Sequence, residues 1–213
     1  MGGILLLLGL AVTAAGAAVI DRIAVVTGTH AIKLSDIDRD LRVTEFQNRE
    51  PLNLSPAARK KAAERLVDQT IIGDEIANGG YQRPSEKDAE ALVAKLRTDR
   101  FGGSDARMRR SLAEYATTED VLRAELLWQL DVLRFIDQRF RPGVNVADEE
   151  VRAYYDQHRS ELARQYPRTP SFEALETKIR ETLEGERINQ AFEEWLQRAR
   201  QRTRIEYKQE AFQ

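Results

Sequence analysis

The chain of 213 residues contains no cysteine. This absence excludes disulfides, thiolate nucleophiles, cysteine-rich zinc sites and a lipidated N-terminal cysteine. Histidine is also scarce: the only two, His30 and His158, stand without other ligand residues close by in the sequence. No glycine-rich phosphate loop follows a predicted strand, and no serine has the context of a nucleophile elbow. We therefore expect neither a metal site nor a cofactor.

The sequence likewise lacks an excess of one charge. Lys and Arg total 33 against 35 Asp and Glu, which gives a net charge of -2, and no long run of one sign occurs. A nucleic-acid-binding protein usually carries a basic stripe, so we do not expect nucleic acid as a partner. Acidic pairs such as Glu149-Glu150 and Glu193-Glu194 are adjacent on predicted helices and point in different directions. They indicate solvated faces and not a general acid and base.

Residues 1–18 have the layout of a secretory signal peptide. An apolar run from Ile4 to Val12 is followed by small residues, with Ala15-Gly16-Ala17 as a cleavage site. No Lys or Arg precedes the run, and the apolar stretch to Ile20 is close to the roughly 20 residues that span a bilayer. An uncleaved membrane anchor and a wrongly chosen start codon stay open as alternatives. We expect export to the periplasm, with membrane contact only through this segment if it is retained.

The alternation of apolar and polar residues predicts a small antiparallel sheet. The apolar and β-branched segments 22–27 and 31–34 flank a turn at Gly28-Thr29-His30, which predicts a hairpin. Segment 204–208 alternates in the same way and predicts a third strand paired with residues 23–26, because an isolated hairpin is only marginally stable. The two ends of the mature chain would then meet in one body.

Helical periodicity and capping residues predict a mainly α fold between these strands. Ser35 is predicted to cap a helix that ends before Pro51, and Thr117 or Thr118 a long helix that is apolar over most of its circumference and therefore central. A helix starting at Asp148 is predicted to end near Tyr155, followed by an irregular stretch over 158–170. The other predicted helices begin at Ser55-Pro56, at Ser85, near Met108 and at Ser171.

The order of these segments resembles a known family. Residues 23–37, the helix around 63–69, the segment 146–155 and the C-terminal stretch 179–205 together resemble the N-terminal domain family of SurA-like periplasmic chaperones, which is related to PpiD and PrsA. The resemblance covers nearly all of the mature chain. It implies one chaperone domain over 19–213, with an N-terminal helical part (19–142), a linker region (143–170), and a C-terminal helix and strand (171–213) that complete the module.

The resemblance also implies which activity is missing. In this family a parvulin-type prolyl isomerase domain usually lies between the equivalents of Tyr155 and Phe172, and here only residues 156–171 occupy that place. We therefore expect no enzyme. A prolyl isomerase function stays open only if the chain catalyses this reaction without a parvulin-type domain.

The function implied is a chaperone that binds unfolded or extended segments of envelope proteins, outer-membrane proteins among them. The alternative from another class is a non-catalytic scaffold for one specific envelope protein, and homo-oligomerisation stays open. For client contact we single out Phe46, Leu52, Leu54 and Met108, apolar residues near predicted helix ends and loops, although a core position remains the commoner role for such residues.

Overall fold

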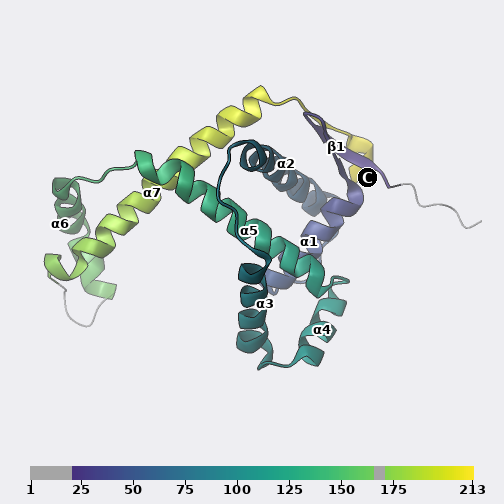
Figure 1. Cartoon of the computed structure of the whole chain (residues 1–213), viewed down its shortest axis with the longest axis horizontal. Helices are drawn as coiled ribbons and strands as arrows, with labels where there is room; N and C mark the ends of the chain where they lie inside the picture. The colour runs from purple at the N-terminus through teal and green to yellow at the C-terminus, as the bar shows by residue number, and fades with distance from the viewer. Residues whose placement is uncertain (1–20, 166–170) are drawn as a thin grey trace, which may run out of the picture.

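The computed structural model describes residues 21–165 and 171–213. Over these ranges the chain is mainly helical with one small antiparallel sheet, as expected (Figure 1). The strands are β1 (Ile23–Thr27), β2 (His30–Lys33) and β3 (Ile205–Tyr207), and the α-helices are α1 (Leu34–Asn48), α2 (Pro56–Asn78), α3 (Glu86–Phe101), α4 (Asp105–Glu114), α5 (Glu119–Phe140), α6 (Asp148–Gln165) and α7 (Phe172–Arg202). Short 3₁₀ turns follow α5 and β3.

The sheet joins the two ends of the described chain, which confirms the predicted pairing. Its strand order is β2-β1-β3, and Val26 of β1 lies opposite Ala31 of β2 and Glu206 of β3. The hairpin turns at Gly28, whose φ of 58° is one that side chains with a Cβ rarely adopt. The sheet therefore fixes the start of α1 next to the end of α7.

Local capping sets where most of the helices begin. Ser55, Thr118 and Ser171 each accept a hydrogen bond from a backbone N–H in the first turn of α2, α5 and α7, as their sequence context predicts. The predicted cap of α1 is wrong. Lys33 is the N-cap, and its N–H donates to Asp36 Oδ2 over 3.0 Å, while the Ser35 hydroxyl donates to Asp21. Because β2 runs directly into α1, the helix starts before Ser35.

The main core lies between the sheet, α1, α2, α5 and α7. Phe135 of α5 is buried at its centre and meets Tyr81 and Trp195 edge-on, with ring centroids 5.1 and 5.3 Å apart. A second core joins α1, α3, α4 and α5. Helix α5 contributes to both, in line with its predicted central position. Its apolar residue Leu133 is nevertheless 63% exposed, so α5 packs on only part of its circumference.

The region predicted as a linker is largely helical. Helix α6 continues through Tyr155 to Gln165 and packs against α7 in a third core that contains Val151, Tyr155 and Ile179. The prediction of an irregular stretch from 158 is therefore wrong up to residue 165, since Leu162 extends the apolar face of α6 onto this core. The rest of this stretch, residues 166–170, lies outside the described residues.

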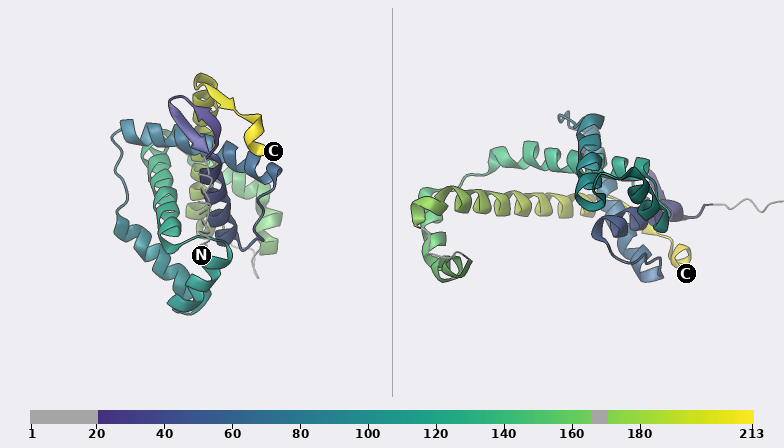
Figure 2. Two further views of the ribbon diagram at one scale, coloured as in Figure 1. Left: turned by 90° about the vertical axis from the view of Figure 1, so that its right-hand side faces the viewer. Right: turned by 90° about the horizontal axis from the view of Figure 1, so that it is seen from below.

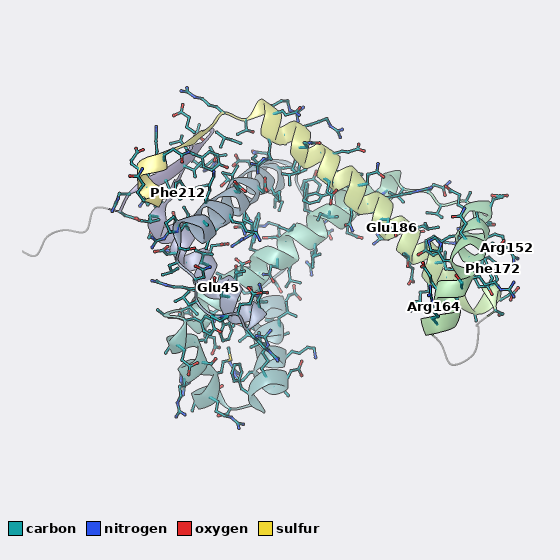
Figure 3. The ribbon with its side chains drawn as sticks, turned by 180° about the vertical axis from the view of Figure 1, so that it is seen from behind. Glu45, Arg152, Arg164, Phe172, Glu186 and Phe212 are labelled. Carbon is teal, nitrogen blue, oxygen red and sulfur yellow. The ribbon has the colours of Figure 1, made fainter. Side chains whose placement is uncertain are left out.

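Figures 1 and 2 show α7 running from the sheet to the far end of the molecule, where α6 packs on it, while α3 and α4 extend to one side of α5. At the far end the guanidinium of Arg152 lies 3.8 Å from the centroid of the Phe172 ring, whereas the buried Phe212 lies beside the sheet (Figure 3). Within the described ranges, no helix has the length and apolar character needed to cross a bilayer.

Candidate functional site

The residues singled out for client contact do not gather at one surface. Phe46 and Met108 are 3% and 0% exposed and belong to the second core, where Phe46 meets Tyr115 edge-on at 5.7 Å. Leu54 packs against the main core, and Leu52 is 38% exposed. Placing Phe46 and Met108 on an accessible surface is therefore wrong. The packing of α3 and α4 against α1 and α5 covers these helix-end positions.

The pockets lie elsewhere, around Trp128 of α5. A pocket of about 430 Å³ lies between α1, α2 and α5, and adjoining hollows of about 340 and 280 Å³ extend it toward β2 and toward the start of α3. Trp128 of α5 lines all three, and we call them together the Trp128 groove. The residues that line its central part are Asp36, Arg39, Asp40, Val43, Leu66, Gln69, Asp120, Val121, Ala124, Glu125 and Trp128.

Trp128 forms the apolar centre of this groove. Its side chain is half-buried and packs on the edge of the main core. The outer edge of its benzene ring faces Gly73 in the middle of α2, where a Cβ would lie 3.8 Å from ring atoms Cζ3 and Cη2. A Cβ at this position would therefore make an ordinary van der Waals contact with the indole. Leu66, Val43 and Val121 add apolar wall on either side.

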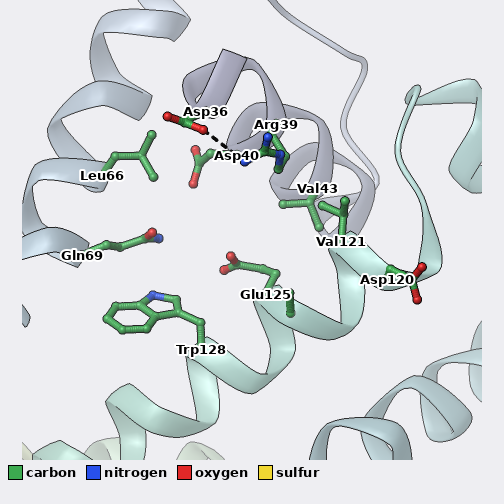
Figure 4. A pocket seen from close by; sticks show the side chains of 11 residues that line it. Asp36, Arg39, Asp40, Val43, Leu66, Gln69, Asp120, Val121, Glu125 and Trp128 are labelled. Atoms are coloured by element: carbon green, nitrogen blue, oxygen red, sulfur yellow. Dashed lines mark hydrogen bonds and ion pairs between the residues drawn. The ribbon is translucent and has the colours of Figure 1, made fainter. Parts of the chain in front are cut away.

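Carboxylates from two helices point into the same space (Figure 4). Asp40 of α1 is 7% exposed and pairs with Arg65 of α2. Asp36 pairs with Arg39 over 3.1 Å, one turn along α1. Glu125 of α5 is half-buried and accepts a hydrogen bond of 2.9 Å from Gln129. The groove is thus apolar along its centre and acidic between α1 and α5.

Burial shifts the pKa of two of these acids. Burial raises the pKa of Asp40 above its ordinary value, and the nearby Arg65 guanidinium opposes this rise. Burial also raises the pKa of Glu125. The hydrogen bond from Gln129 and the charge of Arg65 oppose this rise, and the negative charge of Asp40 adds to it. Partly desolvated acids in a hollow are a common mark of binding sites.

The histidines form no shared site. His30 lies at the rim of the Trp128 groove, where its Nε2 is 2.9 Å from Asp74 Oδ1. His158 of α6 bonds the carbonyl of Tyr154 and stacks on its ring at 4.1 Å. Among the residues that the structure describes, no three His, Asp or Glu side chains converge as a metal site would require.

An aromatic residue at helical spacing, such as Trp128, is most often part of a core, and Glu125 is not among the site residues predicted above. A signal was present. Val121, Glu125 and Trp128 are spaced by four and three residues and so share one face of α5, and Asp36, Asp40 and Val43 repeat this spacing on α1. An acid between apolar residues on one helix face is unusual for a core and favours a partly wet surface.

Comparisons with known proteins assign no family. No protein-family model matches the chain, and no curated protein matches it. The likeness to SurA-like chaperones stays a prediction from the sequence.

Proposed function

We propose that this chain is an exported, non-catalytic binding module that holds extended segments of unfolded envelope proteins in the Trp128 groove. The observation that carries the proposal is the form of the groove. It is bounded by three helices and continues past Trp128 in two directions, toward β2 and toward α3. An extended polypeptide needs such a path, whereas a compact small molecule needs a single enclosed pocket.

The lining residues suit a sequence-tolerant partner. Apolar walls at Leu66, Val121 and Trp128 can take one or two client side chains, each contributing about 1.5–3 kcal/mol when buried. Ordering the client offsets part of this gain, so we expect dissociation constants in the micromolar range. Binding of this strength permits release, which a holding function requires.

Two sequence features support the same proposal. The order of segments resembles the SurA-like chaperones, and residues 156–171 are too few for the isomerase domain of that family. The apolar start of the chain is typical of a signal peptide, which supports a periplasmic location.

The proposal is tested by the suppression of aggregation of an unfolded outer-membrane protein, followed by light scattering. We expect the protein to slow aggregation of this client and of an unrelated unfolded protein. Replacing the exposed Ala124 by Gln narrows the groove without removing a core contact and should weaken the effect. Ala153→Gln, at an exposed position on α6, is the matched control. No suppression at several-fold excess of protein would contradict the proposal.

The same preparation distinguishes the alternatives. Stoichiometric binding to one folded envelope protein, without any effect on unrelated clients, would favour the scaffold. Turnover in a prolyl-isomerisation assay on a short peptide would contradict a non-catalytic function.

A further inference from the structure

Among the residues that the structure describes, Glu125 is the one carboxylate of the central pocket that forms no ion pair. Asp40 has Arg65, Asp36 has Arg39, and Asp120 has Arg123 at 2.5 Å. Glu125 instead has the amide of Gln129, a neutral donor on its own helix. A half-buried carboxylate without a counter-ion is costly, because a neutral hydrogen bond replaces only part of the lost hydration.

Arg65 is the cation of the described chain that acts on Glu125, and it only partly opposes the effect of burial. Its guanidinium forms its ion pair with the buried Asp40 and not with Glu125. Asp40 is itself negative and adds to the field at Glu125. A positive group arriving from outside would therefore meet two carboxylates, one of them unpaired, in a partly desolvated space.

The same position is next to the apolar centre of the groove. Trp128 follows Glu125 by three residues and lies on the same face of α5, and Leu66 and Gln69 of α2 face both across the pocket (Figure 4). A lysine or arginine has an apolar stem and a charged end, so its stem could lie on the indole while its end reaches the carboxylate. An apolar side chain two residues away in the same extended segment points to the same side and would then fill the space toward Leu66.

We propose that the Trp128 groove selects extended segments in which a lysine or arginine stands two residues from an apolar residue, with the cation bound by Glu125. This inference rests on the proposed function and names the class of segment that the groove prefers. Charge complementarity carries it: Glu125 has no ion pair within the described chain, and the cation of the client supplies one.

The test compares peptide affinities. Three fluorescein-labelled peptides carry the same two phenylalanines, each two residues from a central position, and differ only at that position, which is lysine, norleucine or glutamate. Fluorescence anisotropy with the full chain measures each dissociation constant. We expect the lysine peptide to bind about tenfold more tightly than the norleucine peptide and the glutamate peptide most weakly. Added salt should weaken the lysine peptide most, because the contact is ionic.

A variant assigns the preference to one residue. Glu125→Gln keeps the size and the hydrogen bond to Gln129, so it should reduce the advantage of lysine over norleucine to about twofold or less while norleucine binding stays the same. Because burial disfavours the charged form of Glu125, the neutral variant should unfold at the same or a higher temperature, and lost affinity cannot then be explained by lost folding. Glu193→Gln, on the exposed face of α7, is the matched control.

The outcomes separate this inference from the proposed function. Equal binding of all three peptides, or a lysine preference that survives in Glu125→Gln, would overturn the selection by charge and leave a general binding groove. Failure of every peptide to bind would overturn both.

Discussion

Gln129 Nε2 donates a hydrogen bond of 2.9 Å to Glu125 Oε1, one turn earlier on α5. This bond is a weak substitute for an ion pair. The neighbouring Asp40 has an arginine, and Asp36, one turn earlier on α1, has one as well. The groove thus keeps one incompletely balanced charge at its centre. A half-buried carboxylate without an ion pair lowers the stability of the fold, and such residues are often found at binding sites.

The first prediction concerns stability and pH. The pKa of Glu125 is raised in the folded chain above the ordinary 4.5, so the folded state holds this proton more tightly than the unfolded state does. The contribution of Glu125 to stability is then most favourable below 4.5 and is lost as the pH rises through the folded pKa. Glu125→Gln should therefore raise the melting temperature at neutral pH and give no gain at acid pH. Calorimetry at both pH values measures this, and a loss at neutral pH would contradict it.

The second prediction concerns the pair of Arg83 with Asp131. Asp131 is 4% exposed, while the Arg83 side chain is largely exposed. Arg83→Ala leaves a buried carboxylate without its donor and should cost about 1–3 kcal/mol. Asp131→Asn keeps an acceptor and leaves a guanidinium that water can reach, so it should cost less. Urea unfolding of both variants measures the two losses of unfolding free energy. A larger loss in Asp131→Asn than in Arg83→Ala would show that the unpaired arginine, and not the unpaired acid, is the more costly group.

The third prediction concerns Gly73. It lies inside α2 with ordinary helical geometry, and a Cβ there would make a normal contact with the Trp128 ring at 3.8 Å. Gly73→Ala should stabilise the protein by about 0.4–1 kcal/mol, because alanine restricts the unfolded chain more than glycine does. The gain is measured by chemical unfolding. Destabilisation would mean that the indole cannot tolerate the added methyl group.

The fourth prediction concerns the end of α1. Arg49 stops this helix with a φ of 62°, a left-handed conformation that glycine adopts without strain. Its charge also acts together with burial to lower the pKa of Arg100, whose guanidinium donates to the carbonyls of Phe46 and Gln47. Arg49→Gly should therefore stabilise by about 0.5–1 kcal/mol. Arg109→Gly, in the exposed face of α4, should instead cost about 1 kcal/mol.

The fifth prediction concerns the attachment of α6. Arg180 of α7 donates to the carbonyl of Val146 over 2.7 Å and pairs with Asp148 at 2.6 Å, which fixes the start of α6. Arg180→Ala should speed hydrogen exchange in residues 148–165 and leave α2 unchanged. Arg198→Ala, which removes an exposed pair within α7, should change neither region. Equal exchange in α6 of both variants would show that its apolar contacts alone hold it.

The sequence by itself determined the elements whose causes are local. Ser55, Thr118 and Ser171 cap the helices that they precede, and alternation in 22–34 and 204–208 predicts all three strands. Such signals act within one turn or one pair of strands, so a single stretch of chain contains them.

Only the tertiary structure decided which apolar residues are accessible. Phe46 and Met108 stand near helix ends, where the sequence favours an accessible position, yet both are buried in the core that joins α1, α3, α4 and α5. Trp128 has the spacing of a core residue but lines the groove. Helix α6 likewise extends to Gln165 because α7 covers its apolar face. Burial depends on what a distant segment brings to a surface, and helical periodicity describes one face of one helix without naming its partner.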